Sequence, residues 1–229
     1  MNVTLCSAFR NASGYIDRYF KQVHGLEDAL EARGDSFRLI VGEGDSTDDT
    51  WDKVLHGAWQ FVGAIDRYSH GGQDYGSVVN AERFANLAKV WNRIWNYIPA
   101  DADAVLFVES DLIWEPATLL ALLDDLAEHP AVAPMVMLRR EGYHPAFFYD
   151  NWGYWRNGVQ ISIMPPYFAD MPPNGELLEL DSAGSCMAIR GDVARRVTWP
   201  GDVIRGVCRQ IREGGDSVWL NPKVSVTHP

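Results

Sequence analysis

The stretch Ala104-Val-Leu-Phe-Val-Glu109-Ser110-Asp111 decides how this sequence folds. Its unbroken apolar run, residues 104–108, predicts a strand buried on both faces, which is typical of a parallel sheet covered by helices. Two carboxylates follow the strand at once, and in open α/β sheets ligands bind at the carboxyl ends of the strands. An acidic triplet alone is a weak signal, because such triplets also stand at ordinary helix N-termini. Its position here favours a site for Mn²⁺ or Mg²⁺.

Strand and helix patterns alternate on both sides of this stretch. Predicted strands are 2–8, 36–42, 61–68, 104–108 and 131–138, and predicted helices are 16–30, 46–55, 78–98 and 116–127. We expect Ser46 and Asp49 to form a capping box at the start of the 46–55 helix. Segment 141–174, rich in Pro, Gly and aromatic residues, interrupts the alternation, and a strand (178–189), a helix (203–212) and a strand (217–227) follow it. The order predicts an α/β fold with a Rossmann-like, mostly parallel sheet.

Composition sets limits on the class of protein. The chain has 229 residues, 47% of them hydrophobic, which suits one α/β domain. A net charge of -11 disfavours unspecific binding to nucleic acid. Three cysteines without metal-binding spacing indicate a reducing compartment, so we expect a cytoplasmic protein. No apolar run is long enough for a transmembrane segment, and residues 1–9 are too short for a signal peptide.

Several motifs, in order along nearly the whole chain, resemble the GT-A fold of nucleotide-sugar-dependent glycosyltransferases. Their order is most similar to that of the fungal mannan-polymerase type of mannosyltransferase. The motifs are CSAFRN (6–11), EGDSTDDT (43–50), RFANLAK (83–89), ESD (109–111), YDNW (149–152), DSAGSCM (181–187) and a closing segment from Gly214 to His228. The ESD triplet stands where the family has its DxD motif, with Glu109 in place of the first Asp.

The resemblance implies roles for individual residues. The metal ligands would be Glu109, Asp111 and His228. The donor, a nucleotide-diphosphate sugar linked to UDP or GDP, would be held by Arg10, Glu43, Asp45, Arg83 and Ser110. The catalytic residues would be Asp181, in contact with the transferred sugar, and Asp150, on the acceptor side. Carboxylates in such places act as a base or stabilise oxocarbenium charge, and the sequence leaves both roles open. For Arg10 and Arg83, a surface ion pair is an equally good interpretation.

The sequence therefore predicts a single GT-A domain over residues 1–229, with a nucleotide-binding half (1–111) and an acceptor-binding half (112–229). The predicted function is metal-dependent transfer of a sugar from a nucleotide-diphosphate sugar to an acceptor hydroxyl. A saccharide is the expected acceptor, and a modified DNA base stays open. The family's acidic motif before the last helix is absent, because this chain reads VIRGVC at 203–208. This absence suggests a non-catalytic nucleotide-sugar-binding module as one alternative. A nucleotidyltransferase acting on a sugar phosphate is another, because it also uses a Rossmann-like sheet and metals held by carboxylates.

Overall fold

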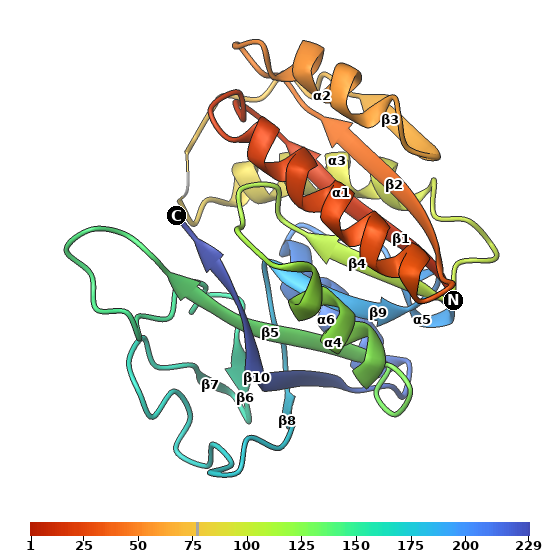
Figure 1. Ribbon diagram of the computed structural model, residues 1–229. Coiled ribbons are helices and arrows are strands. Elements are labelled where there is room, and N and C mark those ends of the chain that lie inside the picture. The colour runs from red at the N-terminus through yellow and green to blue at the C-terminus, as the bar shows by residue number, and fades with distance from the viewer. Residues whose placement is uncertain (77) are drawn as a thin grey trace.

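An eight-stranded sheet with strand order β3-β2-β1-β4-β9-β5-β10-β8 forms the centre of the protein (Figure 1). The structure is a computed structural model, and it describes residues 1–76 and 78–229. The sheet strands are β1 (Asn2–Phe9), β2 (Ser36–Glu43), β3 (Gly63–Arg67), β4 (Ala104–Val108), β5 (Ala131–Leu138), β8 (Leu178–Leu180), β9 (Cys186–Arg190) and β10 (Val218–His228). A separate hairpin joins β6 (Trp155–Arg156) to β7 (Val159–Gln160).

Most strand pairs in the sheet are parallel, which confirms the predicted α/β class. Strands β3, β2, β1 and β4 run parallel to one another, as do β5 and β10. Strand β9 lies antiparallel between β4 and β5, and β8 lies antiparallel to β10 at the edge. The prediction of one strand over 178–189 was wrong, because the chain leaves the sheet between β8 and β9. Ser185 has a φ of 56° there, a left-handed conformation that ends an extended run.

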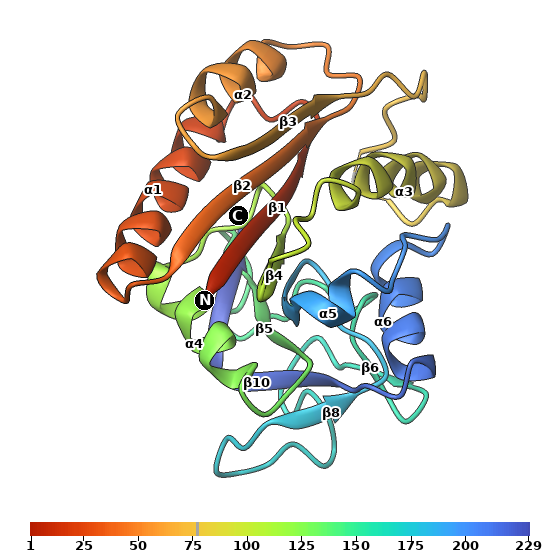
Figure 2. The same ribbon diagram turned by 90° about the vertical axis from the view of Figure 1, so that its right-hand side faces the viewer.

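Helices cover both faces of the sheet (Figure 2). They are α1 (Ile16–Ala32), α2 (Thr50–Ala58), α3 (Ala81–Trp95), α4 (Pro116–Asp125), α5 (Gly191–Ala194) and α6 (Val203–Glu213). Helices α1, α2 and α4 lie on one face, and α3, α5 and α6 lie on the other. No helix in the described ranges is long and apolar enough to span a membrane.

Two predicted helix starts differ from the structure. The capping box at Ser46 is wrong, because the Ser46 hydroxyl accepts a hydrogen bond from the Asn11 backbone (3.0 Å) and α2 begins only at Thr50. The helix predicted from residue 78 begins at Ala81, because the Asn80 side chain accepts a bond from the Arg83 N–H (2.9 Å) and caps it.

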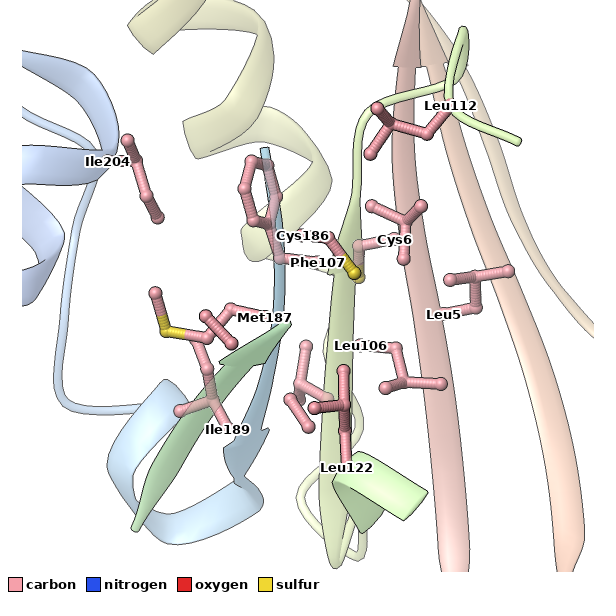
Figure 3. Packing of buried hydrophobic residues seen from close by; sticks show 14 of the residues in the cluster. Leu5, Cys6, Leu106, Phe107, Leu112, Leu122, Cys186, Met187, Ile189 and Ile204 are labelled. Atoms are coloured by element: carbon pink, nitrogen blue, oxygen red, sulfur yellow. The ribbon is translucent and has the colours of Figure 1, made fainter. Parts of the chain in front are cut away.

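The core on both sides of β4 fixes the position of the acidic triplet. All residues of β4 are buried, and Figure 3 shows Leu106 and Phe107 packed among side chains from the neighbouring strands β1 and β9. The Trp91 ring of α3 packs edge-on against Phe107 (4.7 Å) and stacks on Trp199 (4.8 Å). The three cysteines are buried and free.

The last strand brings the C-terminal residues to the end of β4. Strand β10 pairs with β5 along its length, with an irregularity between Asn221 and Ser225. Beyond it, Ile113 and Thr227 exchange two backbone hydrogen bonds of 2.7 and 2.8 Å. This bridge joins the segment after the acidic triplet to the residue before His228, so two segments more than 100 residues apart in the chain meet there.

Candidate active site

Asp111 and His228 form the centre of the candidate site. The Nε2 atom of His228 lies 3.0 Å from Oδ2 of Asp111. The other carboxylate oxygen of Asp111, Oδ1, is buried and has no hydrogen-bond partner in the described part of the chain. A buried carboxylate oxygen without a partner is costly unless a cation or a donor binds it. The backbone around Asp111 is held by Arg18, which donates to the Asp111 carbonyl (2.7 Å).

An aromatic ring orients His228. The Tyr149 ring stacks on the imidazole, with centroids 3.7 Å apart and planes at 15°. The other ring nitrogen, Nδ1, lies 3.0 Å from the Pro229 carbonyl oxygen. These contacts hold Nε2 on the side of Asp111, which is the arrangement in which a histidine and a carboxylate can share a ligand.

Glu109 stands beside this pair in an electrostatically unfavourable place. Its backbone N–H donates to the Ser185 carbonyl (2.8 Å), which fixes the end of β4 against the start of β9. Burial, followed by the charges of Asp111 and Asp150, raises the pKa of Glu109 to about 8. The negative charges of Asp111 and Asp150 therefore act on Glu109 near the end of β4, and a bound cation would offset them.

Asp150 reaches the same region from the segment after β5. Its carboxylate accepts hydrogen bonds from the Ser185 hydroxyl (2.8 Å) and the Gly153 N–H (3.1 Å). Burial raises the pKa of Asp150 to about 6, against the lowering effect of those hydrogen bonds. Gly184 is needed for this approach, because a Cβ there would lie 2.1 Å from the Asp150 carboxylate.

A cavity of about 360 Å³ opens at the carboxyl ends of β1, β2 and β4. This is within the usual range for small-molecule pockets, roughly 300–1,000 Å³. Its wall includes all three residues of the acidic triplet. The other lining residues are Ala8, Phe9, Arg10, Asn11, Tyr15, Gly44, His70, Gln73, Asp74, Tyr75, Gly76, Arg83, Asn86, Leu87, Val90, Trp91 and Tyr149. We call this the first cavity.

A second cavity, of about 260 Å³, adjoins the first. The two share Arg83, Leu87, Trp91, Glu109 and Tyr149, and the second continues to Asp150. Asp150 and Ser185 are among the polar residues of its wall, which is otherwise largely apolar. Glu109 and Tyr149 therefore stand on the boundary between two spaces, where a group carried in one can meet a group carried in the other.

Three of the predicted donor ligands line the first cavity. Ser110 lies in its wall, with its hydroxyl 3.4 Å from that of Tyr15. Arg83 lies in the walls of both cavities. Arg10 also lines the first cavity, and its guanidinium donates to the carbonyls of Gly72 (2.9 Å) and Gln73 (3.3 Å). Its Nε is buried without a partner in the described residues, so this arginine retains one donor for a ligand.

Glu43 and Asp45, two of the residues predicted to hold the donor, have different surroundings. Glu43 is fully buried, and its carboxylate accepts bonds from the Ser46 N–H (2.6 Å) and the Arg67 Nε (3.1 Å). Both carboxylate oxygens of Glu43 therefore have partners within the protein, one in the turn after β2 and one on Arg67 of β3. Asp45 accepts from the backbone N–H groups of His70 (2.9 Å) and Gly71 (2.7 Å), and it lines a shallower hollow beside Arg10.

Asp181, predicted to contact the transferred sugar, is absent from the walls of the cavities described above. Its carboxylate accepts a bond from the Gly158 N–H (2.7 Å) and pairs with Arg212 (3.1 Å). These contacts tie the β6–β7 hairpin to α6. The structure therefore brings Asp150, and not Asp181, to the acidic triplet.

The sequence analysis did not select the loop between β3 and α3 as part of the site. His70, Gln73, Asp74 and Tyr75 line the first cavity, and Asn11 holds the loop by donating to the Asp74 carboxylate (2.6 Å). This loop has no periodic pattern, so only its Gly and polar composition marked it as irregular. Tyr149 was identified as part of the YDNW motif, but no local sequence pattern predicts that its ring stacks on His228.

The site contains donors suited to a divalent cation, although they do not form a complete ligand set. Within residues 1–76 and 78–229, no group of three or more His, Cys, Asp or Glu side chains is close enough to hold a metal ion. The Asp111–His228 pair does fit a metal, because Asp111 Oδ1 lacks a partner and both residue types ligate Mn²⁺. Such a pair leaves other coordination positions for ligand oxygens and water.

Comparisons with known proteins give a fold but no family. No family model matches the chain, and no curated protein sequence matches it. Among solved structures, the chain resembles the mannosyltransferase PcManGT from Pyrobaculum calidifontis, solved with GDP-Man and Mn²⁺ (TM-score 0.60, 16% identity, 99% of this chain and 56% of that one). It also resembles S. aureus TarS 1-349 (0.59, 14%, 99% and 60%) and the same protein with UDP-GlcNAc (0.59, 13%, 99% and 58%).

These likenesses define the class of fold. The chain has the GT-A fold, and the similar solved structures are nucleotide-sugar glycosyltransferases. It spans between about half and two thirds of the length of those three solved chains.

Proposed function

We propose that this protein is a glycosyltransferase that moves a sugar from a nucleotide-diphosphate sugar to an acceptor hydroxyl. One observation carries the proposal: the acidic triplet, paired with His228, lies where two cavities meet at the carboxyl ends of the GT-A sheet strands. A transferase needs this arrangement, because donor and acceptor must be held on either side of the bond that is exchanged.

The donor belongs in the first cavity. Arg10 and Arg83 supply positive charge for the diphosphate, and Ser110 supplies a hydroxyl. Asp45 lies at the hollow that continues toward the expected base and ribose. The neighbouring structures were solved with GDP-Man and with UDP-GlcNAc, so the donor proposed here is GDP- or UDP-linked. The motif order shared with the mannan-polymerase type favours a hexose as the transferred sugar.

A divalent cation, Mn²⁺ or Mg²⁺, belongs between Asp111 and His228. When bound, it would offset the negative charge on the departing diphosphate. Asp111 and His228 hold the ion in this proposal, and Glu109 stands beside them. The Mn²⁺ complex of the archaeal mannosyltransferase supports this assignment by analogy.

The acceptor belongs in the second cavity, beside Asp150. The residues that line this cavity come from both halves proposed from the sequence, 1–111 for the nucleotide and 112–229 for the acceptor. The carboxylate of Asp150, which lies in this wall, is suited to take the proton of an acceptor hydroxyl.

The test is release of a nucleoside diphosphate from a panel of UDP-, GDP- and dTDP-sugars with Mn²⁺. At least one donor should be hydrolysed slowly without an acceptor, and Asp111→Ala should abolish this. Asp124→Ala is the matched control, because Asp124 is exposed and pairs with Arg33 at the surface. Hydrolysis of none of the donors would refute the proposal. Pyrophosphate release from a nucleoside triphosphate would instead support a nucleotidyltransferase.

A further inference from the structure

Most of the residues that line the second cavity have apolar side chains: Val78, Val79, Phe84, Leu87, Trp91, Phe107, Trp152, Trp199, Val203 and Ile204. Its polar lining residues are Arg83, Glu109, Tyr149, Asp150, Asn151 and Ser185. This composition favours a ligand that is largely apolar and carries few hydroxyl groups.

The apolar walls are built from packed aromatic rings. Trp91 and Trp199 stack with centroids 4.8 Å apart, and Phe84 packs on Trp152 at 4.7 Å. The Arg205 guanidinium lies over the Trp152 ring at 5.3 Å and so holds this indole in place. This packing makes the wall rigid, and a rigid wall binds a ligand with little loss of conformational entropy.

The start of α6 supplies part of the wall. Here the sequence, VIRGVC at 203–208, lacks the acidic motif of the mannan-polymerase type of mannosyltransferase that the other motifs resemble. Val203 and Ile204 line the cavity, and both are almost fully buried. Figure 3 shows Phe107 of β4 on the side of the sheet where Ile204 lies. Val203 adopts a φ of 43°, which is strained for a β-branched residue. The chain therefore tolerates backbone strain to place an apolar surface here.

The mouth of the cavity is apolar as well. Val78 and Val79 line it, and their exposed fractions are 49% and 71%. A ligand that covers apolar side chains exposed at the rim of a pocket removes them from water, and this burial stabilises the complex.

We propose, on the basis of the proposed function, that the acceptor is an alcohol or phenol whose hydroxyl is attached to a flat, apolar ring system. A saccharide carries hydroxyl groups around its whole ring. Against walls of Trp, Phe, Val and Ile, most of these groups would lose water without gaining a hydrogen bond. An aromatic alcohol places its one hydroxyl beside Asp150 and its ring against the apolar part of the wall.

The reaction balances with the groups present. The acceptor oxygen forms a bond to the anomeric carbon of the donor sugar. The bond from that carbon to the diphosphate oxygen breaks, and its electron pair leaves with the nucleoside diphosphate. The hydroxyl proton goes to the Asp150 carboxylate and from there to solvent.

The test uses 2-phenylethanol and 2-naphthol as acceptors, with methyl α-glucoside and maltose as the saccharide comparison. The donor is the nucleotide sugar that the protein hydrolyses, and mass spectrometry detects the glycoside. The expected result is a glycoside of an aromatic acceptor and none of either saccharide. Donor hydrolysis without transfer to either aromatic acceptor would overturn the inference while leaving the proposed function standing. Failure to bind or hydrolyse any donor would overturn the proposed function itself.

A pair of variants tests whether the second cavity binds the aromatic acceptor. Val79→Asp places a charge at the mouth, and it should raise the KM for the aromatic acceptor by about tenfold or more. Val62→Asp is the matched control, because Val62 is also 71% exposed and lies outside the cavity walls, so its KM should be unchanged. Both positions are at the surface, so circular dichroism should show folded protein for each. Equal KM values for the two variants would contradict the inference.

Discussion

Replacing Asp150 by asparagine should make the protein more stable and less active. Burial raises the pKa of Asp150 from its ordinary 3.8 to about 6, so its ionised form is disfavoured in the folded state. A tenfold change in a protonation equilibrium is worth about 1.4 kcal/mol, so the ionised carboxylate costs up to about 3 kcal/mol. Its partial exposure reduces this to about 1–3 kcal/mol. In the variant, the asparagine Oδ1 can accept from the Gly153 N–H and the Nδ2 group can donate to the Ser185 hydroxyl, without that cost.

The contribution of Asp150 to the free energy of unfolding should change with pH in one direction. Because the pKa of Asp150 is higher in the folded than in the unfolded chain, the folded state binds more protons between the two values. Asp150 therefore reduces the stability of the wild type progressively as pH rises from about 4 to about 6, with no further loss above that. The free energies of unfolding of wild type and Asp150→Asn should be nearly equal at about pH 4 and should separate by about 1–3 kcal/mol at about pH 7.

Urea denaturation without metal, at several pH values in this range, measures the effect. Asp170→Asn is the control, because the hydrogen bond from Arg156 lowers the pKa of the exposed Asp170 and replacing Asp170 should not stabilise the protein. A difference between wild type and Asp150→Asn that is the same at every pH, or a variant that is less stable throughout, would refute the reasoning. In the transfer assay, Asp150→Asn should lose most activity, and the wild-type rate should increase as pH rises through about 6.

Three further predictions concern the support of the site. Asn80→Ala removes the cap of α3, so it should cost about 1 kcal/mol of stability in urea denaturation and weaken donor binding through the displaced Arg83; unchanged stability would contradict the cap. Trp91→Ala opens the core between α3 and β4 and should cost about 3–5 kcal/mol, read from the same denaturation curves. His228→Gln should weaken Mn²⁺ binding at least about tenfold in calorimetry, and equal affinity would exclude His228 as a ligand.

The order of strands and helices could be predicted because each element carries a local pattern. Strand β4 is an unbroken apolar run, and α3 repeats its apolar residues with the helical period. The path between β8 and β9 could not be predicted, since β9 pairs with β4 and β5 and this pairing depends on residues about 50 to 80 positions away. Hydrogen bonds between distant strands leave no periodic signal in either segment.

The candidate site was predictable where its residues adjoin a strand end. Glu109 and Asp111 follow β4 directly, so their place at the cavity followed from the fold. Glu43 ends β2 and so has a similar place, but its carboxylate accepts hydrogen bonds from Arg67 and Ser46. The Asp181 carboxylate likewise forms an ion pair with Arg212. Whether a carboxylate is free for a ligand depends on partners from other segments, and these partners are not visible in a local motif.

The most direct test of the account is the position of manganese in crystals grown with Mn²⁺ and the nucleoside diphosphate of the hydrolysed donor. Anomalous diffraction at the manganese edge should show a peak within coordination distance, about 2.0–2.3 Å, of both an Asp111 oxygen and His228 Nε2, with diphosphate oxygens on the same ion. A diphosphate bound in the first cavity without metal at Asp111, or manganese bound elsewhere, would contradict the account.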